Sequence, residues 1–178
     1  MRHQYRYKSI IIPKIGDKYI VVRDAKYGEL TFVTGGCKLR ESNIDCALRE
    51  LAEETRESVS VPSLGRPNFT FESRDRSRAE LQADKAQGVF VTMVYNVFIV
   101  PIDASFEHIK RLYNSKNFVN ERYRETSGIY LMSLDELMRS PSTWKFMKDQ
   151  VLPRMIPRKK SRNESSQETP RKRTMNRW

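Results

Sequence analysis

Three glutamates with helical spacing carry the most specific chemistry in this sequence. Glu50, Glu53 and Glu54 stand at positions i, i+3 and i+4, which share one side of an α-helix. Clustered carboxylates repel one another, and a divalent cation compensates that repulsion. Because Mg²⁺ and Mn²⁺ prefer oxygen ligands, the spacing predicts a site for one of these two ions.

The residues before the glutamates fit such a site. Gly35 and Gly36 predict a backbone that approaches a ligand closely. Arg49 lies four residues before Glu53, which lets its guanidinium hold that carboxylate in place. For the three glutamates taken alone, an ordinary amphipathic helix with a solvated acidic face is the alternative interpretation.

The helix that must position the glutamates is predicted to run from an N-cap at Asn43 to about Arg56. An apolar face at i, i+3, i+4 and i+7 supports it. That face consists of Ile44, Ala47, Leu48 and Leu51. We expect this face to be buried and the glutamates to lie roughly opposite it.

Strands and further helices are expected on both sides of this helix. Apolar runs predict strands at 5–12, 18–24, 30–33, 89–100 and 128–132, with a turn at 16–17 and a further strand beginning at 59–61. Helices are predicted at 106–113, from Ser133 with Glu136 as its capping-box partner, and at 142–156. The segment 72–88 is predicted to be a long loop or a short exposed helix. The irregular alternation favours an α/β fold with a mixed sheet between helices.

The stretch from Gly35 to Glu57 resembles the Nudix box. In that motif a glycine, five residues, a glutamate and seven residues precede Arg-Glu-aliphatic-x-Glu-Glu. Gly35, Glu41 and the run from Arg49 to Glu54 stand at those spacings, so seven defined positions match over twenty residues. The family has a second glycine and an aliphatic residue where this chain has Arg56 and Glu57.

The resemblance implies a fold and a set of roles. It implies a Nudix-like α-β-α sandwich with a mixed β-sheet over residues 1–156, and a metal-dependent pyrophosphohydrolase activity. Glu50, Glu53 and Glu54 would coordinate Mg²⁺ or Mn²⁺, and Glu41 would orient the helix or the metal shell. Arg49 would brace a glutamate, and Gly35 with Gly36 would shape the loop.

The base that activates the attacking water would be one of the box glutamates or a glutamate of a later loop. By resemblance to the family's late loop, Glu125 is the first candidate and Glu121 the second. The missing second glycine affects the turn after the helix, where a non-glycine residue in the left-handed conformation costs about 1–2 kcal/mol. Arg56 at the negative end of the helix dipole would offset part of that cost.

Composition limits the class of protein. Hydrophobic residues make up 38% and charged residues 31% of 178 residues, which indicates one domain and a tail. Cys37 and Cys46 are predicted to be free thiols in a reducing compartment. The apolar stretch 89–100 is too short to span a bilayer. We therefore expect an intracellular protein without membrane insertion, in the cytoplasm or alternatively in the nucleus.

The segment 157–178 is expected to be a disordered basic tail that contributes +6 to a net charge of +11. Its two basic clusters are predicted to contact nucleic acid, and they also match the pattern of a two-part nuclear localisation signal. The cluster residues are Lys159, Lys160, Arg171, Lys172 and Arg173.

The box indicates a bond type and leaves the substrate open. One branch of the Nudix family removes caps from RNA, and the basic charge, together with segment 73–85, favours a polyanion such as capped RNA. Free nucleotides, dinucleoside polyphosphates and diphosphoinositol polyphosphates are alternative substrates. An inactive Nudix domain that binds RNA is the alternative of another class. Candidates for stacking on a base are Tyr27, Phe32, Tyr95 and Tyr123.

Overall fold

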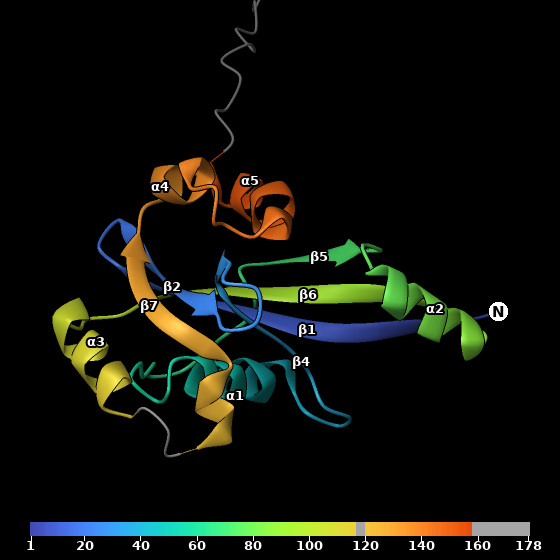
Figure 1. Ribbon diagram of the computed structural model, residues 1–178, viewed down its shortest axis with the longest axis horizontal. Coiled ribbons are helices and arrows are strands. Elements are labelled where there is room, and N and C mark those ends of the chain that lie inside the picture. The colour runs from blue at the N-terminus through green and yellow to red at the C-terminus, as the bar shows by residue number, and fades with distance from the viewer. Residues whose placement is uncertain (117–119, 158–178) are drawn as a thin grey trace, which may run out of the picture.

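A mixed β-sheet lies between two layers of helices in a computed structural model of the chain, which describes residues 1–116 and 120–157 (Figure 1). The strands are β1 (Arg2–Ile15), β2 (Lys18–Asp24), β3 (Leu30–Thr31), β4 (Val33–Gly36), β5 (Phe69–Ser73), β6 (Val89–Pro101) and β7 (Thr126–Met132). The helices are α1 (Asn43–Glu54), α2 (Arg78–Ala86), α3 (Phe106–Ser115), α4 (Leu134–Arg139) and α5 (Leu152–Met155). Two short turns, the 3₁₀ turn η1 (Glu121–Arg124) and the π-helical turn η2 (Met147–Val151), complete the elements. The predicted α-β-α sandwich is confirmed.

The sheet is built around the parallel pair β1 and β6, whose register runs from Arg2 opposite Val89 to Lys14 opposite Pro101. The order is β3-β2-β1-β6-β5, with β4 pairing with β1 and β7 with β2. Gly16, at a φ of +60°, forms the predicted tight turn between β1 and β2. Among the described residues, no helix is long and apolar enough to cross a membrane.

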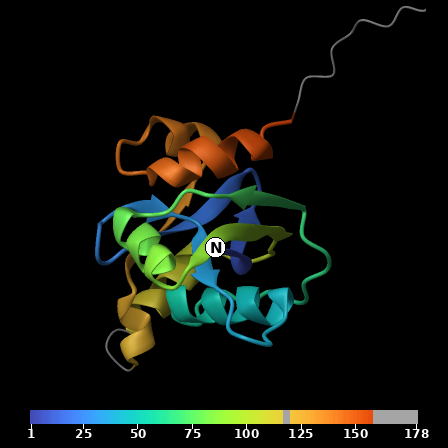
Figure 2. The ribbon, with the colours of Figure 1, turned by 90° about the vertical axis from the view of Figure 1, so that its right-hand side faces the viewer.

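Each face of the sheet has its own apolar core because strand side chains alternate between faces. One core joins Ile11, Ile20 and Val22 of the sheet to α1 and α3. The other joins Ile10 and Ile12 to α4, η2 and α5. Figure 2 shows the resulting layers, with α1 on one side of the sheet and α4 and α5 on the other.

Helix α1 differs from its prediction at both ends and on its buried face. Ser42 is the N-cap, since its hydroxyl accepts a hydrogen bond from the Asp45 N–H, and the helix ends at Glu54. Ala47 and Leu51 are buried as expected, whereas Ile44 and Leu48 are exposed. The buried stripe is rotated toward Glu50 and Glu54, so the acidic residues do not lie opposite the core as predicted.

Three other segments differ from their predictions. Residues 59–61 form no strand, although Val59 is buried against α1 and α3. Strand β5 was not predicted, and it forms because Phe69 and Phe71 pack into the core behind α5. The final helical segment starts at Lys145 rather than Ser142, since Thr143 bridges to Leu30 and its hydroxyl donates to the Leu137 carbonyl. Segment 72–88 contains α2, in agreement with the predicted short helix.

Cys37 and Cys46 form a disulfide, so the prediction of free thiols is wrong. Their Cα atoms lie 5.1 Å apart, a distance that a disulfide spans readily. They meet because the chain folds back after β4: Cys37 donates its N–H to the Tyr7 carbonyl beside α1, where Cys46 is buried. A separation of nine residues in sequence does not reveal this proximity.

We expect reduction of this disulfide to lower the free energy of unfolding by about 2–3 kcal/mol, because the cross-link closes a short loop in the unfolded chain. Urea titrations with and without dithiothreitol measure the difference. The Cys37→Ser/Cys46→Ser variant is the control and should not respond to the reductant. Equal stability of the wild type in both titrations would contradict the expectation.

Candidate functional site

The carboxylates of Glu50, Glu54 and Glu125 meet at one end of α1. One oxygen of each lies within 4.8 Å of an oxygen of the other two. Glu50 and Glu54 come from successive turns of α1, and Glu125 comes from the junction between η1 and β7. This oxygen-only donor set has the chemistry that Mg²⁺ and Mn²⁺ require, so these residues fit the predicted metal ion.

Burial makes this group of carboxylates electrostatically unfavourable by itself. Glu50 and Glu54 are only 6% and 9% exposed. Loss of water raises the pKa of Glu54 well above its usual value, and the neighbouring Glu50 raises it further. Desolvation also raises the pKa of Glu50 and Glu125, although Arg49 opposes the shift at both. A bound cation would remove this penalty.

Gly35 allows the backbone of β4 to pass directly against Glu50. A Cβ atom at Gly35 would lie 1.8 Å from the Glu50 Cδ atom, whereas one at Gly36 would meet nothing within 4 Å. The predicted close approach of the glycine loop is therefore made at Gly35. The Gly36 carbonyl has a different role: it accepts a hydrogen bond of 2.9 Å from Arg49.

Arg49 connects the loop to the helix. Its guanidinium contacts both oxygens of Glu41, at 2.7 and 3.0 Å, and one oxygen of Glu50 at 2.7 Å. Glu41 also accepts the Lys38 N–H at 2.8 Å. The hydrogen bonds from Arg49 lower the pKa of Glu41 to about 2. Glu41 therefore orients Arg49, which in turn fixes the Glu50 carboxylate.

Glu53 lies outside the group formed by Glu50, Glu54 and Glu125. One of its oxygens contacts Arg49 at 3.2 Å and the other contacts Arg122 of η1 at 3.3 Å. The three box glutamates are therefore not equivalent in the structure, although their spacing predicted one shared site. Both carboxylate oxygens of Glu53 therefore already contact an arginine.

Arg56 positions the loop that carries Glu125. It is buried and left-handed at a φ of +54°, the conformation for which the family has its glycine. Its guanidinium donates to the carbonyls of Tyr123 and Thr126, on both sides of Glu125, and stacks over the Tyr113 ring. Arg56, at the position where the Nudix box has its second glycine, therefore joins the end of α1 to the loop that carries Glu125.

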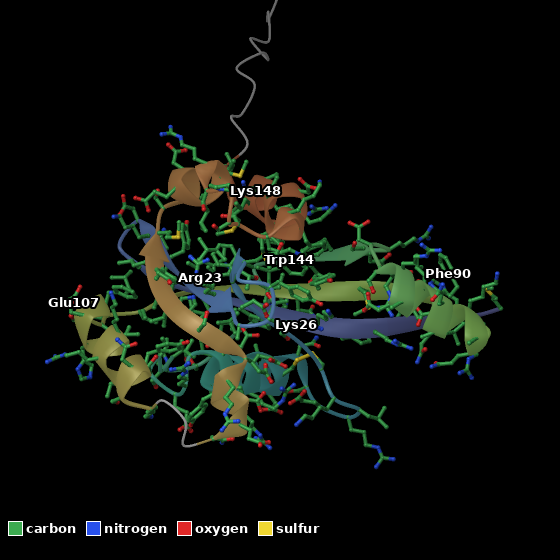
Figure 3. The ribbon with its side chains drawn as sticks, in the orientation of Figure 1. Arg23, Lys26, Phe90, Glu107, Trp144 and Lys148 are labelled. Carbon is green, nitrogen blue, oxygen red and sulfur yellow. A yellow bond between two sulfur atoms is a disulfide. The ribbon has the colours of Figure 1, made fainter. Side chains whose placement is uncertain are left out.

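A cleft of about 480 Å³ opens beside Glu54. Its lining includes Lys8, Asp24, Tyr27, Thr34, Glu54 and Trp144. Figure 3 shows Trp144 on the α5 side of the sheet and Lys26 on the loop between β2 and β3, which carries Tyr27. With Glu29, the lining therefore combines two aromatic rings, one cation and three carboxylates.

Three of the four aromatic residues predicted to stack on a base lie outside the cleft, and some residues of the cleft lining were not predicted. Phe32 and Tyr95 are core residues, and the Tyr123 hydroxyl is bonded to Glu57. Trp144 and Lys8 were missed because nothing in their local sequence links them to the box. Both basic clusters of segment 157–178 lie outside the described residues.

The fold is found in solved Nudix structures. A pyrophosphohydrolase of Bacillus subtilis, BsRppH, has a TM-score of 0.55 and 20% identity, over 82% of this chain and 75% of that one. The MutT protein of Methanosarcina mazei has a TM-score of 0.58 and 12% identity, over 87% of this chain and 97% of that one. The dihydroneopterin triphosphate pyrophosphohydrolase of Escherichia coli has a TM-score of 0.52 and 14% identity, over 83% of this chain and 92% of that one. No protein-family model and no curated protein matches the sequence. The chain therefore has the Nudix fold.

We expect Gly35→Ala to weaken Mn²⁺ binding by roughly tenfold or more, because the new Cβ displaces the Glu50 carboxylate. Gly36→Ala is the matched control and should bind as the wild type does, since its Cβ meets open space. The EPR signal of free Mn²⁺ gives both affinities. Equal affinity in the two variants would show that Glu50 does not hold the ion.

Proposed function

We propose that this chain hydrolyses a diphosphate linkage in a nucleotide-type substrate with Mg²⁺ or Mn²⁺, and that capped RNA is its leading substrate. The observation that carries the proposal is the group formed by Glu50, Glu54 and Glu125 beside a cleft with two aromatic rings. The Nudix box and the Nudix fold support the same reaction class, since BsRppH and the Escherichia coli protein are named pyrophosphohydrolases.

Glu50 and Glu54 would hold the ion, with Glu53 as the further ligand that the box implies. When bound, such an ion neutralises charge on the phosphate oxygens and lowers the pKa of water. Arg49 keeps the Glu50 carboxylate in place. Gly35 leaves space for that carboxylate.

Glu125 is the proposed base. Its carboxylate is exposed, unlike those of Glu50 and Glu54, so it can reach a water molecule. Arg56 fixes the backbone on both sides of it. Glu54, by contrast, is buried and accepts the Thr34 N–H at 3.4 Å.

The cleft supports a nucleotide-type substrate. Tyr27 is exposed and Trp144 is half-buried at its lining, so both rings are available to a base. Lys8, in the same lining, supplies a positive charge for a phosphate. The net charge of +11 further favours a polyanion, which supports capped RNA over a small neutral substrate.

We expect Glu125→Gln to lower kcat by about 10²-fold or more with little change in thermal stability, because the base is lost and the fold is not. Glu121→Gln, on the same exposed turn, is the control and should retain turnover. Near-normal turnover of Glu125→Gln would remove this residue from the mechanism.

A panel of substrates tests the function itself. It contains capped RNA, free cap analogue, nucleoside triphosphates, dinucleoside polyphosphates and diphosphoinositol phosphates, with Glu53→Gln/Glu54→Gln as the blank. Metal-dependent release of a capped nucleotide from RNA supports decapping. Turnover of small molecules alone points to nucleotide or inositol phosphates, and no turnover above the blank leaves an RNA-binding domain as the better account.

A further inference from the structure

A second, larger groove runs from the glycine loop along the open edge of β1. Strand β4 ends opposite Lys8, so within the described residues the edge of β1 before Lys8 has no partner strand. The groove has a volume of about 980 Å³. Residues 4–8 form its floor, and the loop 36–43 and the start of α2 form its walls. We call it the β1-edge groove.

The groove is positively charged. Its lining contains five cationic side chains and two carboxylates. Arg76 is paired with Glu80 and Asp84, Arg6 lies 3.6 Å from Asp84, and Arg49 neutralises Glu41. Among the described residues, the remaining three cations take part in no ion pair and are available to an anionic ligand. These three are Lys8, Lys38 and Arg40.

Exposed aromatic rings lie along the same edge. Tyr5 and Tyr7 are 49% and 48% exposed. Because they stand two residues apart on a strand, their side chains point to the same side, and His3 continues the row with its ring 4.6 Å from that of Tyr5. Rings in a row beside unpaired cations are the combination by which proteins bind single-stranded nucleic acid, since bases stack on rings and phosphates meet cations.

The groove adjoins the candidate active site. Lys8 lines both the groove and the cleft beside Glu54. The groove wall also contains Gly36 and Glu41, which bind Arg49. A chain attached to a phosphate in the cleft can therefore pass Lys8 and cross the open edge of β1 to the face that carries Tyr5 and Tyr7.

We propose that the β1-edge groove binds the single-stranded nucleic acid that follows the reactive diphosphate and guides it into the cleft. This inference deepens the proposed function and rests on it for the direction of the strand. Lys38 and Arg40 contact backbone phosphates, and Tyr5 and Tyr7 stack on bases. The groove thereby favours a long substrate over a free nucleotide.

Binding is tested without turnover, by fluorescence anisotropy of labelled 20-nucleotide RNA and DNA single strands in EDTA. Lys38→Gln/Arg40→Gln should reduce affinity about tenfold and lower the slope of log affinity against log salt by about 1.4, for two phosphate contacts on a single strand. Tyr5→Ala/Tyr7→Ala should reduce affinity by a similar factor. A loss of affinity for RNA, for DNA or for both supports the proposal. The strand that the wild type binds more tightly shows which nucleic acid the groove accepts.

Lys110→Gln/Arg111→Gln removes the same charge from α3, at the end of the molecule away from the groove (Figure 1), and should change affinity less than twofold. An equal loss in this control, or no loss in the groove variants, overturns the proposal. Residues 158–178 carry eight Lys or Arg that also attract RNA. The full-length protein is therefore also cross-linked to 5-iodouridine RNA, and cross-links that avoid the peptide with Tyr5 and Tyr7 overturn the proposal as well.

The experiments distinguish a failure of the groove proposal from a failure of the proposed function. If groove variants lose RNA binding but no substrate is hydrolysed by the wild type, the proposed function is wrong and the binding surface stands. If hydrolysis is observed and the groove variants bind RNA as the wild type does, the groove proposal is wrong and the hydrolase stands.

Discussion

Two like charges held out of water at one end of α1 are the constraint on which the candidate site depends. Glu50 and Glu54 occupy the buried stripe of that helix, in positions where apolar side chains would stabilise the core without penalty. Their raised pKa values express the cost of this arrangement. The arrangement fits the Mg²⁺ or Mn²⁺ site that we propose.

Four contacts with other segments hold this group in place. Gly35 brings β4 against Glu50, and Arg49 joins the helix to Glu41 and to the Gly36 carbonyl. Arg56 fastens the segment that contributes Glu125. The disulfide between Cys37 and Cys46 ties the loop after β4 to α1. Segments far apart in sequence are thus fixed to one helix, which gives the carboxylates a defined geometry before any ligand arrives.

The box and the alternating strands were predictable because their signals are local. Fixed spacing places Glu50 and Glu54 on one helix, and apolar runs predict β1, β2 and β6. Features that depend on distant contacts were not predictable. The ion pairs of Glu53 with Arg49 and Arg122, the place of Trp144 in the cleft and the open edge of β1 all follow from how separate segments pack. The sequence also could not decide between Ser42 and Asn43 as the N-cap of α1, since both residue types are good caps.

The most direct test of the buried-carboxylate account is the free energy of unfolding of the wild type and Glu54→Gln, measured by urea titration in EDTA and in excess Mn²⁺. The account predicts that in EDTA the variant is more stable by roughly 1 kcal/mol, because a buried charge is removed and the amide oxygen can still accept the Thr34 N–H. In Mn²⁺ the order should reverse, because the ion stabilises only the wild type strongly. Glu107→Gln, on exposed α3 (Figure 3), should match the wild type throughout. A Glu54→Gln variant that is less stable than the wild type in EDTA, with no reversal in Mn²⁺, would contradict the account.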